Sequence, residues 1–144
     1  MSPTAIGETN LDHLIRSMEP TLHPDEFVFS TFSDTANASF SNDQDKLLAL
    51  NPIMQFKESE GITLILNHAK AVECGVEFEF PCRMITLNIH SSLDAVGFLA
   101  RITTALAALD MGVNPVSGFF HDHLFVPVDK AAIAMRELHR ISSE

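Results

Sequence analysis

A short stretch in the second half of the sequence places hydroxyl, carboxylate and glycine residues directly before an apolar run. Residues 91–94 (SSLD) fit the capping pattern [ST]xx[DE], and Gly97 follows. A helix N-terminus leaves about four N–H groups unpaired and carries partial positive charge, which suits the carboxylate of a small zwitterion. Asp94 could bind its ammonium group, and Gly97 allows close approach because it lacks a Cβ. The alternative is structural: Ser91 and Asp94 only cap the helix.

Histidines form a second candidate site, around residues 121–123 (HDH), with His90 as a further member. Zinc and iron sites use histidine together with carboxylates, so a metal-dependent enzyme is one hypothesis. However, His121 and His123 flank a tight turn, where Asp and His also form local hydrogen bonds. We therefore expect a turn here, with no metal and no other cofactor.

Thiols and carboxylates elsewhere in the chain give weaker indications of catalysis. Cys74 and Cys82 have a spacing that fits no metal or redox motif, and a cysteine nucleophile needs a base beside it. Glu77 and Glu79 are two apart in an alternating run, which predicts one solvated strand face rather than an acid–base pair. The sequence holds no phosphate-binding loop, dinucleotide motif or HExxH. We expect no catalytic residues and no enzyme.

Composition restricts the class of protein further. The chain has 144 residues, of which 46% are apolar and 19% charged, which suits one ordinary domain or two very small ones. Its formal net charge is −10 and its basic residues are scattered, which argues against nucleic acid and anionic membranes as partners. No apolar stretch reaches the ~18–20 residues of a membrane helix. Without a secretory pattern at the N-terminus, we expect a cytoplasmic location.

Apolar spacing predicts the elements that must position these residues. In the first half we expect helices over 10–18 and 68–74, and strands over 26–32, 53–58, 62–67 and 76–80. The polar run 33–45 predicts a loop. In the second half we expect strands over 84–90, 113–120 and 123–128, and helices over 95–111 and 130–141. Pro81 marks the joint, and a weak echo between residues 64–72 and 125–133 favours two half-size ferredoxin-like units.

Two segments of the second half carry a family resemblance. They are residues 90–98 (HSSLDAVGF) and 114–126 (NPVSGFFHDHLFV). Supporting pieces in the first half are 14–22 (LIRSMEPTL), 27–29 (FVF) and 56–64 (FKESEGITL). Together they resemble the tandem ACT-domain family of small proteins, to which the regulatory regions of aspartokinases and arginine-sensing ACT proteins look related.

This resemblance implies an α+β fold of two ferredoxin-like ACT units of the βαββαβ type, with antiparallel sheets and helices on one face. The first unit would span 1–81, with an N-terminal helix and a long polar loop over 33–51, and the second would span 82–144. Because that loop is long and polar, we expect the first unit to lack a regular first helix. The second unit shows no fourth strand after its last helix, so we expect that strand from the N-terminal half or from a partner chain.

ACT domains commonly bind amino acids where two units meet, which implies a site at the loop from the first strand into the first helix. The residues implied here are Ser91, Ser92, Leu93, Asp94, Ala95, Val96, Gly97, Phe98, Asn114 and Val116. We predict a small non-enzymatic regulatory or sensing protein that binds a free amino acid at a unit or subunit interface. It would form a homodimer or a higher homo-oligomer. The main alternative is a purely structural, homo-oligomerising interaction protein without a ligand.

Overall fold

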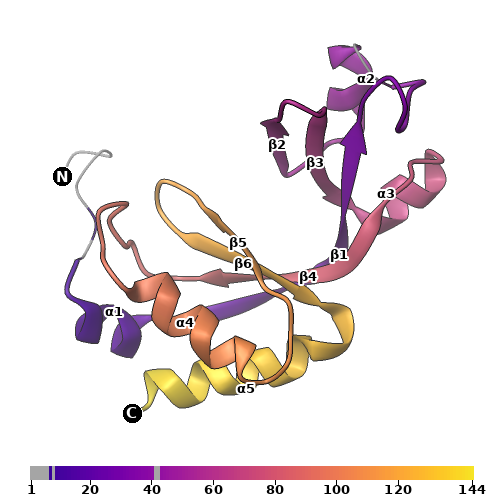
Figure 1. Cartoon of the computed structure of the whole chain (residues 1–144). Helices are drawn as coiled ribbons and strands as arrows, with labels where there is room; N and C mark the ends of the chain where they lie inside the picture. The colour runs from indigo at the N-terminus through magenta and orange to yellow at the C-terminus, as the bar shows by residue number, and fades with distance from the viewer. Residues whose placement is uncertain (1–6, 8, 41–42) are drawn as a thin grey trace. The chain divides into compact units, whose positions relative to one another are not determined.

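The structure is a computed structural model that describes residues 7, 9–40 and 43–144. Figure 1 shows the elements along the chain. The helices are α1 (Leu11–Ser17), α2 (Gln44–Ala49), α3 (His68–Glu73), α4 (Phe98–Ala107) and α5 (Ala131–Ser142), preceded by the 3-10 helix η1 (Val128–Lys130). The strands are β1 (Pro20–Phe32), β2 (Met54–Lys57), β3 (Ile62–Asn67), β4 (Glu79–Leu87), β5 (Asn114–Ser117) and β6 (Asp122–Pro127). No helix in this described part is long and apolar enough to cross a bilayer.

Contacts within the chain divide it into two compact units. Unit 1 combines Met1–His23, in its described part, with Arg83–Glu144, and unit 2 is Pro24–Cys82. The strands are hydrogen-bonded in the order β2-β3-β1-β4-β6-β5, and the chain passes between the units within β1 and β4. The α+β fold of ferredoxin-like units is therefore confirmed. The predicted division at residue 81 follows the sequence repeat and stays a prediction beside this spatial division.

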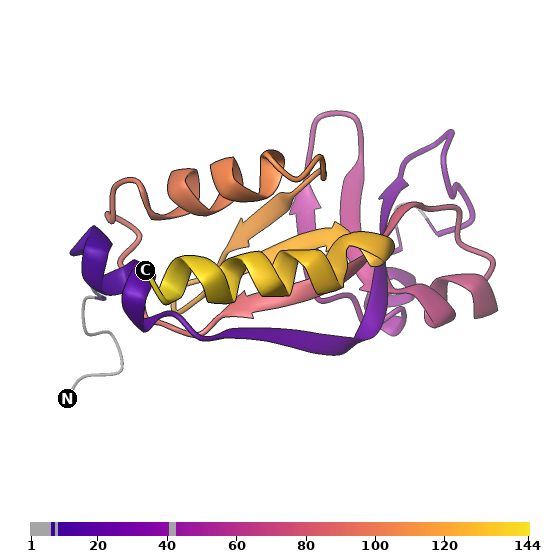
Figure 2. The ribbon, with the colours of Figure 1, turned by 90° about the horizontal axis from the view of Figure 1, so that it is seen from below.

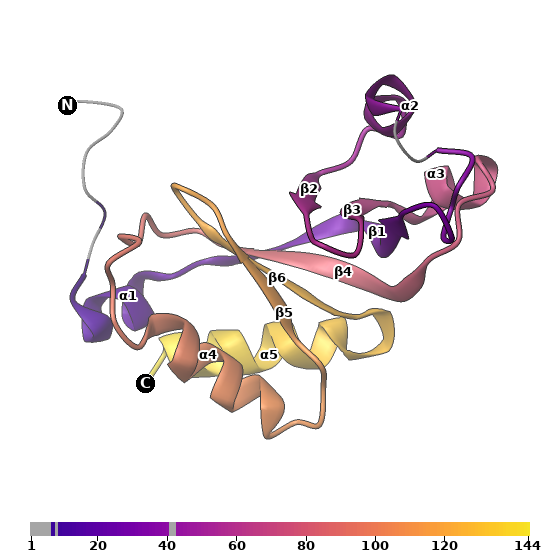
Figure 3. The same cartoon turned by 45° about the horizontal axis from the view of Figure 1, so that its top comes forward.

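Unit 2 holds the β-hairpin predicted around Gly61. β2 pairs antiparallel with β3, and β3 pairs antiparallel with β1, with Ser30 opposite Leu64. Figure 3 shows β2, β3 and β1 following one another in this order. Apolar residues from the strands, from α2 and α3 and from the residues directly after these helices form its core: Val28, Phe32, Leu47, Leu50, Leu64, Leu66, Ala71 and Val76. The strands thus bury one face against the two helices.

Unit 1 is built around α1, α4 and α5, which pack against one another. Figure 2 shows α4 and α5 side by side. Every fourth residue of α4 (Phe98, Ile102, Leu106) is buried, which gives the helix a single apolar stripe. These residues pack with Leu14 of α1 and Leu138 of α5 in one cluster. The first part of β1 lies beside β4, so the fourth strand of this unit comes from the N-terminal part of the same chain.

Four predicted elements are wrong in detail. The strand predicted over 26–32 begins at Pro20, as β1. A six-residue helix, α2, lies inside the loop predicted over 33–51, so the expectation that the first unit lacks its first helix is wrong. Its N-cap, Asp43, accepts a hydrogen bond from the Lys46 N–H at 3.1 Å, and Leu47 is buried. Residues 79–87 form the single strand β4, which continues past Pro81, in place of two strands. The helix predicted from residue 95 begins at Phe98.

Candidate functional site

The candidate site begins where the chain leaves β4 and enters α4. Gly97 is the N-cap of α4 and adopts a left-handed conformation (φ 89°), which glycine tolerates because it has no Cβ. No side chain caps this helix, so the predicted capping box is wrong. Ser92 Oγ instead accepts a hydrogen bond from the Asp94 N–H at 3.0 Å within the loop. The partial positive charge of the α4 N-terminus is therefore left without a side-chain acceptor.

A buried carboxylate lies at the same corner of unit 1. Asp122, at the start of β6, is only 7% exposed. The Ser117 hydroxyl donates to its Oδ1 at 2.6 Å, and the Ser91 hydroxyl donates to its Oδ2 at 3.1 Å. Hydrogen bonds of this kind are what allow a carboxylate to be buried. Sequence reasoning assigned Asp122 to the turn, whereas the structure places it as the first residue of β6.

A pocket of about 200 Å³ opens beside these groups. The predicted ligand-binding residues that line it are Ser91, Ser92, Leu93, Ala95, Gly97 and Phe98. Residues outside the prediction complete the lining: Leu99, Ala100, Ser117 and Asp122. Asp94 and Val96 are exposed in the loop, and Asn114 and Val116 lie on β5, opposite Phe125 and His123. The pocket thus brings together the helix N-terminus, two serines and the buried Asp122, but not Asp94.

One histidine of the β5–β6 hairpin, His123, takes part in a hydrogen-bonded chain with Thr86 and with His23 of β1. Thr86 Oγ1 lies 3.1 Å from His23 Nε2 and 2.9 Å from His123 Nδ1. Burial, reinforced by the neighbouring His121, lowers the pKa of His123, so its neutral form is favoured. His90 packs its ring against Phe120, with centroids 5.1 Å apart. Within the described residues, no group of three or more His, Cys, Asp or Glu side chains is arranged to hold a metal ion.

The two cysteines are free thiols. Cys82 is fully buried and donates to the carbonyl oxygen of Phe27 at 3.3 Å. Burial raises the pKa of its thiol to about 12. Because the thiolate is the reactive form, this side chain is inert near neutral pH. Cys74 is half-buried at the end of α3.

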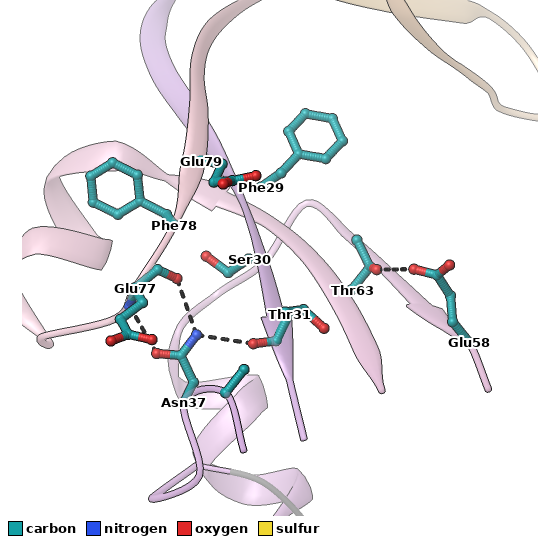
Figure 4. Close-up of a pocket in the computed structure, with 10 residues that line it drawn as sticks. Phe29, Ser30, Thr31, Asn37, Glu58, Thr63, Glu77, Phe78 and Glu79 are labelled. Carbon is teal, nitrogen blue, oxygen red and sulfur yellow. Dashed lines mark hydrogen bonds between the residues drawn. The ribbon is translucent and has the colours of Figure 1, made fainter. Parts of the chain in front are cut away.

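Unit 2 carries a larger pocket, of about 600 Å³, that sequence reasoning missed. Figure 4 shows it between the end of β1 and the segment that leads into β4. Asn37 joins the two: its Nδ2 donates to the carbonyl oxygens of Thr31 and Glu77, both at 3.0 Å, and its Oδ1 accepts from the Glu77 N–H at 2.8 Å. The side-chain amide therefore holds the two sides of this pocket in place.

Comparison with known proteins identifies the family. Two ACT-domain models match the sequence, over residues 6–83 and 79–140. The chain belongs to the ACT-domain family. ACT domains are regulatory rather than catalytic modules, and they commonly bind amino acids and oligomerise. No curated protein matches this sequence.

Solved structures with a similar fold extend the comparison. A Vibrio cholerae protein of unknown function, described as a possible transport protein, is 36% identical, with 92% of this chain and 95% of that protein covered and a TM-score of 0.76. The ligand-free regulatory subunit of aspartate kinase from Thermus thermophilus is 12% identical, with 88% and 97% covered and a TM-score of 0.64. Escherichia coli aspartokinase III, in complex with aspartate and ADP, is 14% identical, with 91% and 34% covered and a TM-score of 0.64. At these low identities, the aspartokinases show a shared fold.

Proposed function

We propose that this ACT protein is a non-enzymatic regulatory protein that binds a free amino acid at the corner between β4 and α4. One observation carries the proposal: the uncapped N-terminus of α4 and the buried carboxylate of Asp122 line the same small pocket. A free amino acid carries one group for each of them. The pocket volume of about 200 Å³ suits a ligand of this size better than a larger cofactor.

The α-carboxylate would lie at the start of α4, where backbone N–H groups and the helix dipole favour an anion. Gly97 permits close approach there because it has no Cβ. The space that a Cβ would fill is open, since its nearest neighbour would be a side-chain carbon of Leu11, 3.5 Å away. The ammonium would bind Asp122, whose oxygens accept one hydroxyl each and keep lone pairs for a further donor. Asp94, exposed in the preceding loop, is the second candidate for that role.

Binding would become regulation by changing how copies of this chain associate. The family's tendency to oligomerise supports a homodimer or higher homo-oligomer. We propose a cytoplasmic location for it, as the sequence led us to expect. A ligand shifts such an equilibrium only by its difference in affinity for the two states. The site we propose lies at the start of α4, which packs against α1 and α5. Helix α4 therefore links the pocket to the other two helices of unit 1.

A thermal-shift screen of the twenty amino acids tests the proposal. One amino acid, or a few of related chemistry, should raise the melting temperature, and the rise should grow with the logarithm of ligand concentration. At 100 times Kd the ligand should add about 2.7 kcal/mol to the free energy of unfolding. Asp122→Asn should abolish the shift, measured against the melting temperature of this variant without ligand. Asp94→Ala decides whether the loop carboxylate contributes, and Asp129→Asn, an exposed change in η1, should leave the shift intact.

The structural alternative makes a different prediction for the same samples. If no amino acid raises the melting temperature at millimolar concentration while the chain still self-associates in size-exclusion chromatography, the protein is an assembly module without a ligand. A shift that survives Asp122→Asn and Asp94→Ala together would place the ligand away from this corner.

A further inference from the structure

The pocket of unit 2 contains a buried hydroxyl without a partner. Ser30 lies on the same face of β1 as Val28 and Phe32, is 5% exposed, and lines the pocket of about 600 Å³. Figure 4 shows its hydroxyl pointing toward the segment that carries Glu77, Phe78 and Glu79. Among the described residues, its Oγ is the buried side-chain polar atom for which no hydrogen-bond partner is found. Buried polar atoms are nearly always paired, so this one indicates a group that enters the pocket.

The charge of the lining defines the class of that group. Three carboxylates, from Glu58, Glu77 and Glu79, line the pocket, and no Lys, Arg or His side chain does. Glu58 accepts a hydrogen bond from the Thr63 hydroxyl. Such a lining attracts cations and repels any ligand that carries a carboxylate of its own. An amino acid of the kind proposed for unit 1 would therefore be disfavoured here.

The apolar part of the lining indicates that the cation is organic. The rings of Phe29 and Phe78 line the same pocket, and Figure 4 shows them on either side of Glu79. Aromatic rings bind methylene chains by burial of apolar surface and bind ammonium groups over their faces. The carboxylates are spread along the lining and form no group that could hold a metal ion in the described part of the chain. A flexible chain with several charges can reach them in a way that a single ion cannot.

We propose that this pocket binds an aliphatic diamine or polyamine, with the Ser30 hydroxyl accepting from one ammonium group and the glutamates pairing with the others. The frame for this ligand is already present, because Asn37 fixes the two sides of the pocket through three hydrogen bonds. A preformed site loses less conformational entropy on binding. This site is independent of the amino-acid site proposed for unit 1.

Isothermal titration of the full chain with putrescine and spermidine tests the proposal. We expect saturable binding of one ligand per chain. Glu79→Gln should weaken it about 5-fold, the effect of one partly exposed ion pair. Ser30→Ala should weaken it about 10-fold, because a hydrogen bond to a charged group is lost. Glu73→Gln removes the same charge from the exposed face of α3, outside this pocket, and should leave the affinity unchanged.

Four outcomes would overturn the proposal. Titration without saturation would show no site, and equal losses for Glu79→Gln and Glu73→Gln would show diffuse attraction to an acidic surface. Lysine binding as tightly as putrescine would contradict the exclusion of carboxylates. If magnesium competes with spermidine, and Glu79→Gln weakens the binding of both equally, the pocket is a metal site rather than a polyamine site. Because Glu79 is exposed, its variant tests the site without changing a buried side chain.

Discussion

Unit 1 and unit 2 treat their buried polar groups in opposite ways. At the corner of unit 1, both oxygens of Asp122 accept hydrogen bonds, from Ser117 and Ser91. In the pocket of unit 2, Ser30 is buried without a partner. The chain thus completes one polar site from its own side chains and leaves the other incomplete, so the two pockets are suited to different ligands.

Helices α2 and α4, which follow β1 and β4 along the chain, differ in the same respect. In unit 2, the Asp43 carboxylate caps α2 by accepting from the Lys46 N–H. In unit 1, Gly97 occupies the corresponding position of α4 and supplies no side chain. A carboxylate already occupies the anion-binding end of α2, whereas the end of α4 is open to one from a ligand. We therefore expect the zwitterion site in unit 1 alone.

The largest expected effect concerns the carboxylate of unit 1. Asp122→Ala should lower the free energy of unfolding by about 3 kcal/mol, because two charge-assisted hydrogen bonds are lost and two hydroxyls are left without their acceptor. Urea denaturation measures the change. Asp129→Ala, an exposed position, should change stability by less than about 0.5 kcal/mol. Equal losses in the two variants would mean that Asp122 does not organise the corner.

Replacing a buried serine by alanine should change the free energy of unfolding in opposite directions in the two units. Ser91→Ala removes a hydroxyl that donates to Asp122, and we expect a loss of about 1 kcal/mol. Ser30→Ala removes a hydroxyl without a partner, and we expect a gain of about 1 kcal/mol in the absence of ligand. Denaturation curves of both variants, recorded side by side, measure the difference. Two losses of similar size would remove the contrast between the units.

A smaller effect is expected at the capped helix of unit 2. Asp43→Ala should cost about 1 kcal/mol, since the Lys46 N–H loses its acceptor. Asp45→Ala, in the first turn of the same helix, removes an equal charge without the capping bond and should cost only a few tenths of a kcal/mol. Thermal unfolding followed by circular dichroism separates the two. If both variants lose the same amount, the charge rather than the cap stabilises α2.

The weakest effect should be a pH dependence from unit 1. The pKa of His123 is lowered in the folded protein, so the unfolded chain binds more protons once the pH falls below about 6.5. The contribution of His123 to stability is therefore complete above that pH and is lost as the pH falls toward the folded-state pKa. Unfolding measured between pH 8 and 5 should show a shallower decline in His123→Asn than in the exposed control His139→Asn. A slope unaffected by His123→Asn would contradict this assignment.

Local patterns in the sequence predicted the fold well. The helical spacing of Leu14 and Met18, the hairpin glycine Gly61 and the helix end at Gly75, which has a positive φ of 67°, each correspond to the structure. Helix α2 was missed because the loop predicted from the polar run 33–45 was extended to residue 51, across a readable helix signal. That signal is the N-cap Asp43, followed by buried leucines three residues apart at Leu47 and Leu50.

Contacts between residues far apart in the sequence limited how much of the candidate site could be predicted. Ser91 has the spacing of a capping box, yet its hydroxyl binds Asp122, 31 residues away along the chain. The partner of a side chain at that separation depends on how β6 lies beside β4, which local spacing does not encode. The absence of a partner for Ser30 is likewise a property of the folded chain. Pro81 favours a break locally, but pairing with neighbouring strands carries β4 past it.

The way the chain threads through its two units has a consequence for biosynthesis. Unit 2 is one uninterrupted segment, so it has all its parts once residue 82 has left the ribosome. Unit 1 is complete only after α5 has been synthesised, because its two pieces flank that segment. Arg83 joins the two pieces, since its guanidinium donates to the carbonyl oxygen of His23 at 2.8 and 3.0 Å. During translation, the beginning of β1 therefore stays without its unit until the final helix has been made.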